Sequence, residues 1–266
     1  MSCACGHHHP APADVSGRPV PLARPLVALH GRLICTDMSQ MLTALDLLPD
    51  HRALSRAEPG CLRFDVEQSE DPMAWTLTEL FADDAAFAAH QTRTTASPWG
   101  QAGRALTRDF HRHEVQPLIR PEAPGDHDAL DRLLTLAFGR PDEAHLLRRL
   151  RADGDLAVSL LAHAEGVPIA HVALSPLQAE RPALALAPLA VHPALQRRGL
   201  GRALTAAALA AAGDRPVVTL GDPELYAGCG FVPADLASPW SGPALQIHGD
   251  LPTGSRITHA PAFHDL

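Results

Sequence analysis

Residues 186–213 contain the residues whose types and spacing most clearly predict a chemical role, which is the binding of a phosphate group. The run opens with apolar residues that predict a buried strand, and an Ala- and Leu-rich helix is predicted from residue 202 onward. The first backbone N–H groups of a helix lack internal partners and carry partial positive charge, so they bind anions. Gly199 and Gly201 lack Cβ atoms and let a pyrophosphate approach the backbone closely. The turn reads Gln196-Arg197-Arg198-Gly199-Leu200-Gly201, with two cationic side chains beside the predicted site.

The spacing of this turn is more specific than two glycines before a helix. A Gln-x-x-Gly-x-Gly pattern after a strand ending Ala-Val-His-Pro resembles the acetyl-CoA signature of the GNAT superfamily of N-acetyltransferases. It differs from the dinucleotide fingerprint, since no acidic ribose partner follows at the required distance. The alternative is an ordinary helix start with an Arg-rich first turn. The resemblance implies that acetyl-CoA is the cosubstrate, held by Leu189, Ala190, Val191, Gln196, Arg197, Arg198, Gly199, Leu200 and Gly201.

Tyr226 is the only tyrosine in the chain and begins a Tyr-x-x-x-Gly-Phe pattern after a predicted strand. With Gly221-Asp222-Pro223, His171-Val172-Ala173 and Pro261-Ala262-Phe263, this pattern resembles the YhbS-like subgroup of the GNAT superfamily. The resemblance implies a bulged strand whose freed N–H groups bond the thioester oxygen, and a Tyr226 hydroxyl that protonates the departing CoA thiolate. The alternative for Tyr226 is a packed aromatic side chain with a bonded hydroxyl.

The sequence does not identify a general base for acetyl transfer. His171 and His192 have intrinsic pKa values in a suitable range, but either side chain can instead be structural. Bulk water can also deprotonate a weakly basic amine. The acceptor, a small-molecule or peptide amine, is not specified, because the helices that shape its pocket have a generic sequence.

The N-terminal half supplies a second set of elements, in residues 25–114. Its predicted order of strand, helix, two strands, helix and strand is ferredoxin-like. The segments that resemble the antibiotic biosynthesis monooxygenase (ABM) family are Glu58-Pro59-Gly60-Cys61-Leu62-Arg63-Phe64, Thr78-Glu79-Leu80-Phe81 with Asp83, and Phe87-Ala88-Ala89-His90.

The ABM resemblance implies a homodimer whose sheets join into an α/β barrel. Some members oxidise phenols or quinols without metal or flavin, and His90 and Glu79 are the residues that could face such a pocket. The alternative is a dimerisation or ligand-binding module without chemistry, in which His90 simply bonds a backbone carbonyl.

The remaining segments complete the expected organisation. Residues 115–266 are expected to form the GNAT mixed-sheet domain, so the fold class combines α+β and α/β parts. Residues 1–24 form a Pro- and Ala-rich tail that is expected to be disordered. Its thiols and imidazoles could hold zinc or copper, or the tail could be inert in the cell. These candidate ligands are Cys3, Cys5, His7, His8 and His9.

Composition excludes several classes of function. The net charge of −8 argues against a large nucleic-acid surface. No apolar run reaches membrane-spanning length and no signal-peptide pattern opens the chain, so a cytoplasmic protein without membrane partners is expected. The leading interpretation is an acyl-CoA-dependent N-acetyltransferase with an ABM-like module. The alternatives are a non-catalytic sensor of CoA, a metabolite or a metal, and a cofactor-free quinol or phenol monooxygenase.

Overall fold

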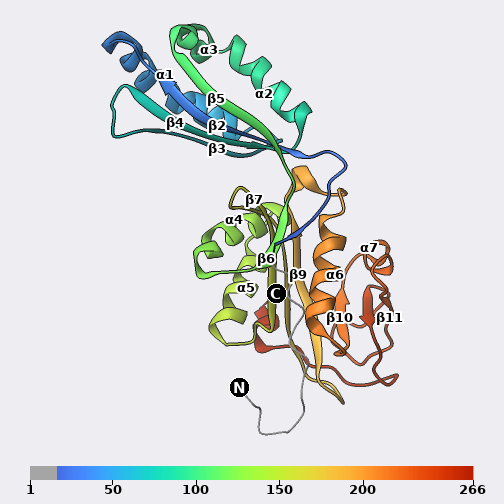
Figure 1. Cartoon of the computed structure of the whole chain (residues 1–266). Helices are drawn as coiled ribbons and strands as arrows, with labels where there is room; N and C mark the ends of the chain where they lie inside the picture. The colour runs from blue at the N-terminus through green and yellow to red at the C-terminus, as the bar shows by residue number, and fades with distance from the viewer. Residues whose placement is uncertain (1–16, 266) are drawn as a thin grey trace. The chain divides into compact units, whose positions relative to one another are not determined.

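Figure 1 shows the computed structural model, which describes residues 17–265 and divides the chain into two units. The first unit comprises residues 21–117 together with the short segment 163–167. The second unit comprises the described residues before 21, residues 118–162, and those from 168 onward.

The first unit is a four-stranded sheet covered on one face by helices. The sheet order is β3-β4-β2-β5 and every pairing is antiparallel. This is the ferredoxin-like order, so that prediction is confirmed, and the sheet of the single chain is open and not a closed barrel. The elements are β2 (Leu26–Ile34), α1 (Met38–Arg56), β3 (Cys61–Gln68), β4 (Ala74–Phe81), α2 (Asp84–Ala96), α3 (Pro98–Ala102), the 3₁₀ turn η1 (Gly103–Ala105) and β5 (Thr107–Val115).

Alternation along the strands decides which side chains meet the helices of the first unit. Leu29 and Leu33 of β2 lie four residues apart and therefore on the same face of the strand, with Gly31 midway between them, and both are buried. They pack in one cluster with Phe64 of β3 and Leu48 of α1. The helix-facing side of the sheet is therefore the one that can hold a cavity.

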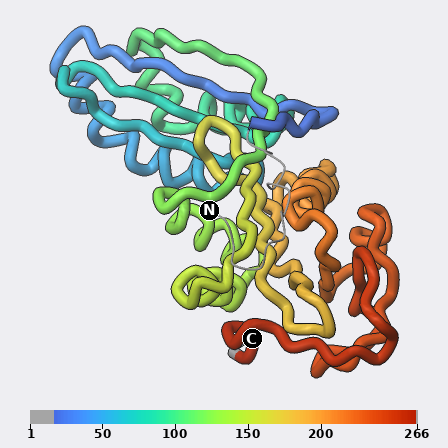
Figure 2. Tube along the Cα trace, turned by 60° about the horizontal axis from the view of Figure 1, so that its bottom comes forward, coloured from blue at the N-terminus to red at the C-terminus, as the bar shows by residue number. Residues whose placement is uncertain are grey.

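The second unit is an eight-stranded sheet in the order β1-β6-β7-β8-β9-β10-β12-β11. Figures 1 and 2 show α4 and α5 on one face of its central strands and α6 on the other. Its strands are β1 (Arg18–Pro19), β6 (Leu118–Pro121), β7 (Val158–Ala164), β8 (Val167–Leu177), β9 (Ala183–Val191), β10 (Val217–Leu220), β11 (Val232–Pro233) and β12 (Leu245–His248). Its helices are η2 (Pro124–Asp126), α4 (His127–Phe138), α5 (Asp142–Ala152), η3 (Pro193–Leu195), α6 (Leu200–Ala212), α7 (Pro223–Ala227) and η4 (Pro261–Asp265).

The strand β9 has different neighbours along its two sides. It pairs with β8 in antiparallel register as far as Val191, with a register shift between Val172 and Leu174. Its parallel pairing with β10 runs only from Leu184 to Leu186. The second half of β9 therefore diverges from β10, and this divergence creates the space in which the candidate site lies.

Strand β1 belongs to the second unit although it precedes the first unit in the chain. Arg18 pairs with Ile119 and Pro19 with Leu118, so residues 21–117 are inserted between two neighbouring strands of one sheet. The expected tail, residues 1–24, thus includes a strand. A two-residue ladder of Arg and Pro has no hydrophobic period, so its sequence carried no signal for a strand. The predicted metal ligands from Cys3 to His9 lie outside the described residues.

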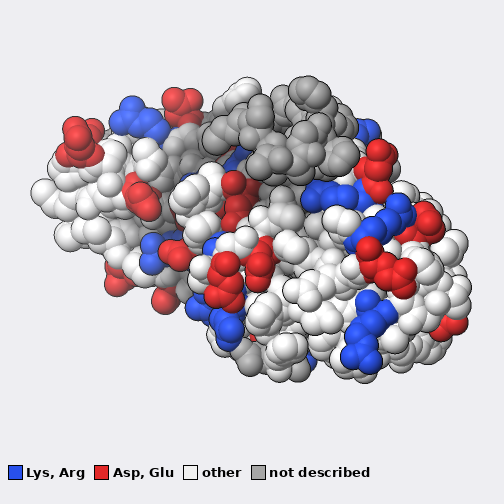
Figure 3. Space-filling model, turned by 90° about the horizontal axis from the view of Figure 1, so that it is seen from below, with Lys and Arg blue, Asp and Glu red and all other residues white. Residues whose placement is uncertain are grey.

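The surface charges are mixed in sign. On the face that Figure 3 shows, acidic and basic side chains are interspersed over the residues that are not grey. Within residues 17–265, none of the helices has the length and apolar character needed to cross a membrane.

Candidate active site

The turn between β9 and α6 has the backbone geometry that an anion site needs. Gly199 is the N-cap of α6 and has a φ of 93°, while Arg197 has a φ of 60°. Both values lie in the left-handed region, which costs little for glycine and more for arginine. The turn aims the first N–H groups of a 13-residue helix at the space beside β9. The buried Leu200, Leu204 and Ala208 fix the helix against the sheet.

A cavity of about 710 Å³ lies over this turn. Seven of the nine predicted acetyl-CoA residues line it, while the Ala190 side chain packs in the core and Arg198 is not among the lining residues. Sequence reasoning missed five lining residues, which come from η3, from the first turn of α6 and from the α7 region: Leu195, Arg202, Asp222, Glu224 and Leu225. The lining residues are Leu189, Val191, Leu195, Gln196, Arg197, Gly199, Leu200, Gly201, Arg202, Asp222, Glu224 and Leu225.

A second cavity, of about 490 Å³, continues from the first between the diverging strands. The two cavities share Leu189, Asp222 and Leu225 as lining residues. The second one is bounded by residues 185–189 of β9 and residues 218–221 around the end of β10, and Tyr226 lies in its wall. The predicted phosphate turn and Tyr226 are therefore brought together along one continuous space.

Tyr226 is held rigidly in this wall. The Asp222 side chain accepts a hydrogen bond from the Glu224 N–H and so caps the short helix α7. The Tyr226 side chain is 5% exposed and meets Phe231 edge to face, with ring centroids 5.3 Å apart. A Cβ at Gly221 would lie 2.8 Å from the Tyr226 ring, so the glycine provides the space for it.

Burial raises the pKa of the Tyr226 phenol, and a hydrogen bond with Thr219 opposes that rise only in part. The hydroxyl is therefore protonated at neutral pH. A protonated phenol beside a cavity can donate a proton to a leaving group, which is the chemistry expected of an acid catalyst.

The two histidines considered as general bases are placed differently from Tyr226. His171 is fully buried, and its Nε2 lies 2.8 Å from Ser159 Oγ and 3.5 Å from Glu122 Oε2. Its burial lowers the pKa of the imidazole despite the nearby carboxylate. His192 Nδ1 accepts a hydrogen bond from the Ala194 N–H and so caps a 3₁₀ turn. Neither side chain lines the two cavities described above.

The end of the second cavity opposite the phosphate turn was not found from the sequence. It is lined by side chains from α4, α5 and the C-terminal segment, which no local motif connects. Two carboxylates line the second cavity: Asp222, near the phosphate turn, and Glu143, at this end. The residues that line this end are Phe138, Arg140, Glu143, Leu146, Trp240, His259 and Phe263.

The first unit has its own cavity, of about 290 Å³, between the sheet and the helices. The structure brings Glu79 and His90 together in its wall, with His90 Nε2 4.0 Å from Glu79 Oε1. His90 Nδ1 makes a 2.9 Å hydrogen bond to Glu58, so its partner is a carboxylate and not a backbone carbonyl. Arg93 also donates to Glu58, over 2.6 Å.

Burial decides the charge states in this cavity. Glu79 is 3% exposed, and burial together with the negative charge of Glu58 raises its pKa to about 8. Burial and the neighbouring Arg93 lower the pKa of His51 to about 3. At neutral pH the cavity therefore presents a largely protonated carboxyl and a neutral imidazole, which are hydrogen-bonding groups without net charge.

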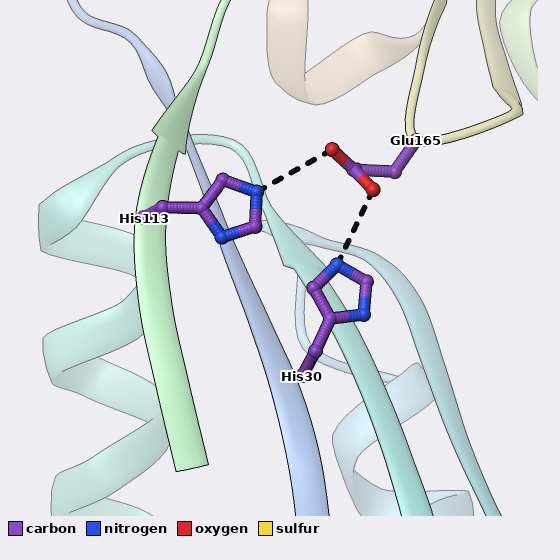
Figure 4. Close-up of side chains that lie close together, drawn as sticks. All are labelled: His30, His113 and Glu165. Atoms are coloured by element: carbon purple, nitrogen blue, oxygen red, sulfur yellow. Dashed lines mark hydrogen bonds and ion pairs between the residues drawn. The ribbon is translucent and has the colours of Figure 1, made fainter.

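A further cluster of donor side chains in the first unit was also missed. Figure 4 shows Glu165 between His30 and His113, with Oε2 3.2 Å from His30 Nε2 and Oε1 3.4 Å from His113 Nε2. These three residues come from the β2 and β5 strands and from the segment 163–167. Two imidazoles and a carboxylate are donors that borderline divalent metals accept. The hydrogen bond to His113 and the ion pair with His30 are by themselves sufficient to explain the arrangement.

Comparisons with known proteins give a consistent result for both units. The family model for the acetyltransferase (GNAT) family matches residues 127–231, and the model for antibiotic biosynthesis monooxygenase matches residues 42–99. The chain is 41% identical over 143 residues to the uncharacterized N-acetyltransferase YhbS of Escherichia coli (strain K12), covering 49% of this chain and 86% of that relative.

A solved structure is also similar to the second unit. It is the GNAT family N-acetyltransferase (YhbS) from Escherichia coli in complex with CoA. The TM-score is 0.52 at 35% sequence identity, and the match covers 56% of this chain and 92% of that structure.

Proposed function

The chain belongs to the GNAT family of N-acetyltransferases through its C-terminal half, and from this premise we propose that it transfers an acetyl group from acetyl-CoA to a small-molecule or peptide amine. One observation carries the proposal. The space over the N-terminus of α6 continues between β9 and β10 to the buried hydroxyl of Tyr226. A long thioester lying in this space would have its phosphates at one end and its sulfur near a proton donor.

In this proposal, the turn before α6 and the strand β9 bind different parts of acetyl-CoA. The N–H groups at the start of α6 and the side chains of Gln196 and Arg197 would hold the pyrophosphate. Backbone groups of Leu189 and Val191, on the part of β9 that has left β10, would bond the pantetheine arm and the thioester oxygen. The CoA complex of the YhbS structure supports a CoA site in this fold.

The reaction needs one proton donor and a neutral amine. The amine nitrogen attacks the thioester carbonyl carbon, the C–N bond forms, and the C–S bond breaks. The Tyr226 phenol gives its proton to the departing sulfur, which becomes the thiol of CoA. The proton lost from the attacking nitrogen then restores the phenol, so the enzyme returns to its starting state.

Acetyl-CoA turnover tests the proposal directly. The full-length chain is incubated with acetyl-CoA and a panel of amines, and release of the CoA thiol is followed. Amine-dependent release is the expected result. Tight CoA binding without release for any amine would instead favour the non-catalytic sensor.

The ABM-like half supports a second activity of different chemistry. Its cavity of about 290 Å³ joins a protonated carboxyl at Glu79 to the imidazole of His90, a setting for a small ligand with hydroxyl or carbonyl groups. We infer that this half binds such a ligand, and that oxidation of a quinol or phenol is the reaction to test. Oxygen uptake by the full-length chain with reduced quinols, compared with the His90→Ala variant, separates an oxygenase from a binding module.

A further inference from the structure

Glu143 has an unusual position at the far end of the second cavity. Its side chain is 10% exposed, and Oε1 accepts a 2.6 Å hydrogen bond from Arg140 Nη2. Oε2 is buried and has no hydrogen-bond partner among the described residues, although the residue lines the cavity that Tyr226 also lines. A buried carboxylate oxygen without a partner costs free energy, so a donor from a ligand would stabilise it.

Apart from Arg140, the wall around Glu143 is largely apolar and aromatic. Phe138 of α4, Leu146 of α5, and Trp240 and Phe263 of the C-terminal segment line this end of the cavity. The rings of Trp240 and His259 meet edge to face with their centroids 4.8 Å apart, and the His259 ring also packs against Phe263. Burial lowers the pKa of His259 to about 4, so this imidazole is neutral and adds no positive charge near the carboxylate.

Arg140 does not satisfy both oxygens of the Glu143 carboxylate. Its side chain is 58% exposed and also contacts Asp142, over 3.3 Å. Arg140 lines the same cavity, and its hydrogen bond satisfies only one oxygen of Glu143. The second oxygen remains available to a group that enters the cavity, and in a low-dielectric wall a cationic donor gains most from it.

We propose that Glu143 and the surrounding aromatic side chains form the acceptor subsite, and that the acceptor is a primary amine on an apolar or aromatic body, bound first as its ammonium ion. This inference rests on the proposed acetyl transfer, since it names the substrate class of the same cavity. Glu143 Oε2 takes one proton from the ammonium and releases it to water. The neutral amine is then the nucleophile that attacks the thioester carbon.

Direct binding tests the subsite independently of turnover. Calorimetry on the full-length chain, saturated with CoA, compares 2-phenylethylamine with 2-phenylethanol, which has the same body and no positive charge. The parent protein should bind the amine at least tenfold more tightly than the alcohol. In Glu143→Gln that preference should vanish, while the affinity for the alcohol should stay within about twofold and CoA affinity should not change.

Two further variants control the experiment. Asp142→Asn removes the neighbouring carboxylate, which pairs with the same Arg140 but does not line the cavity, and should keep the preference for the amine. Arg140→Gln leaves Glu143 unpaired and should keep or increase that preference. Should Glu143→Gln fail to fold, loss of the preference in Arg140→Gln still overturns the proposal.

The outcomes separate this inference from the proposed function. An absent preference in the parent, a preference that survives Glu143→Gln, or no binding of either compound would overturn the subsite. Acetyl transfer to some other amine could then still stand. Conversely, amine binding that depends on Glu143 in a protein that releases no CoA from acetyl-CoA would retain the subsite and refute the transferase.

Discussion

Tyr226 is the residue whose loss should separate binding from catalysis. We expect Tyr226→Phe to keep the fold and the affinity for acetyl-CoA, because the ring still packs against Phe231 and only the hydroxyl is lost. Turnover should fall by about 10²- to 10⁴-fold, in kcat more than in KM, since the thiolate charge develops near the transition state. Steady-state kinetics with the amine found by screening measure this effect.

If Tyr226 has only a packing role, the expected effect of Tyr226→Phe on turnover is the opposite. If the hydroxyl only completes packing, the Phe variant should turn over at nearly the parent rate and lose about 1 kcal/mol of stability with the missing hydrogen bond. Equal rates of acetyl-CoA hydrolysis and amine transfer in the two proteins would therefore remove Tyr226 from the mechanism.

Glu79 should give the first unit a pH dependence opposite to that of an ordinary carboxylate. Its folded-state pKa of about 8 lies above the usual glutamate pKa of 4.5, so the native state holds a proton that the unfolded chain has already released. Stability should fall by about 1 kcal/mol per pH unit between pH 6.5 and 8. The pKa of His51 is lowered instead, so this imidazole reduces stability only below pH 6.5.

Urea unfolding followed by tryptophan fluorescence at pH 6.5 and pH 8 measures this slope. Trp75 and Trp99 are both buried in the first unit and report on it. Glu79→Gln should flatten the decline, while Glu67→Gln, on an exposed position of β3, should leave it unchanged. A parent-like decline in Glu79→Gln would show that another group is responsible.

At the scale of elements, the turn before α6 should control the affinity for acetyl-CoA. Gly201→Glu places a carboxylate where the pyrophosphate would bind, and affinity should fall at least tenfold, about 1.4 kcal/mol. Gly201→Ala adds a Cβ without a charge, and because that Cβ would lie 3.7 Å from Val191 the fold accepts it. Any smaller loss of affinity in this variant measures the close approach of the pyrophosphate alone. Calorimetry that finds unchanged affinity in a folded Glu variant would place the phosphates elsewhere.

The elements that the sequence predicted well are those with a local signal. The turn before α6 is encoded by two closely spaced glycines, and the four strands of the first unit by alternation between turns. Glu143 could not be recognised in the same way. It sits in the first turn of α5 beside Asp142, where an acidic residue is ordinary, and only tertiary folding brings it to Trp240 and Tyr226.

Gly228 lies against a side chain from another element. A Cβ at this position would lie 3.2 Å from the Arg202 guanidinium, so a side chain from α6 already fills that space. Arg202 also lines the larger cavity, and its positive charge therefore lies beside the space proposed for acetyl-CoA.

At the scale of the whole molecule, the open sheet of the ABM-like half should make the protein a homodimer. One face of that sheet is covered by α1, α2 and α3 in the single chain. The resemblance to the ABM family implies that the other faces of two copies join. Sedimentation of the full-length chain over a wide concentration range should give the mass of a dimer. A monomer at the highest concentration would refute this arrangement.

The pairing of β1 with β6 also sets an order of events during synthesis. Strand β1 leaves the ribosome first, but its partner does not exist until residues 21–117 have been translated. At about 5–20 residues per second, that interval lasts roughly 5–20 s. The ABM-like unit is thus complete, apart from segment 163–167, while the acetyltransferase unit still consists of a single short strand. It can begin to fold before the competing hydrophobic strands of the larger sheet have been made.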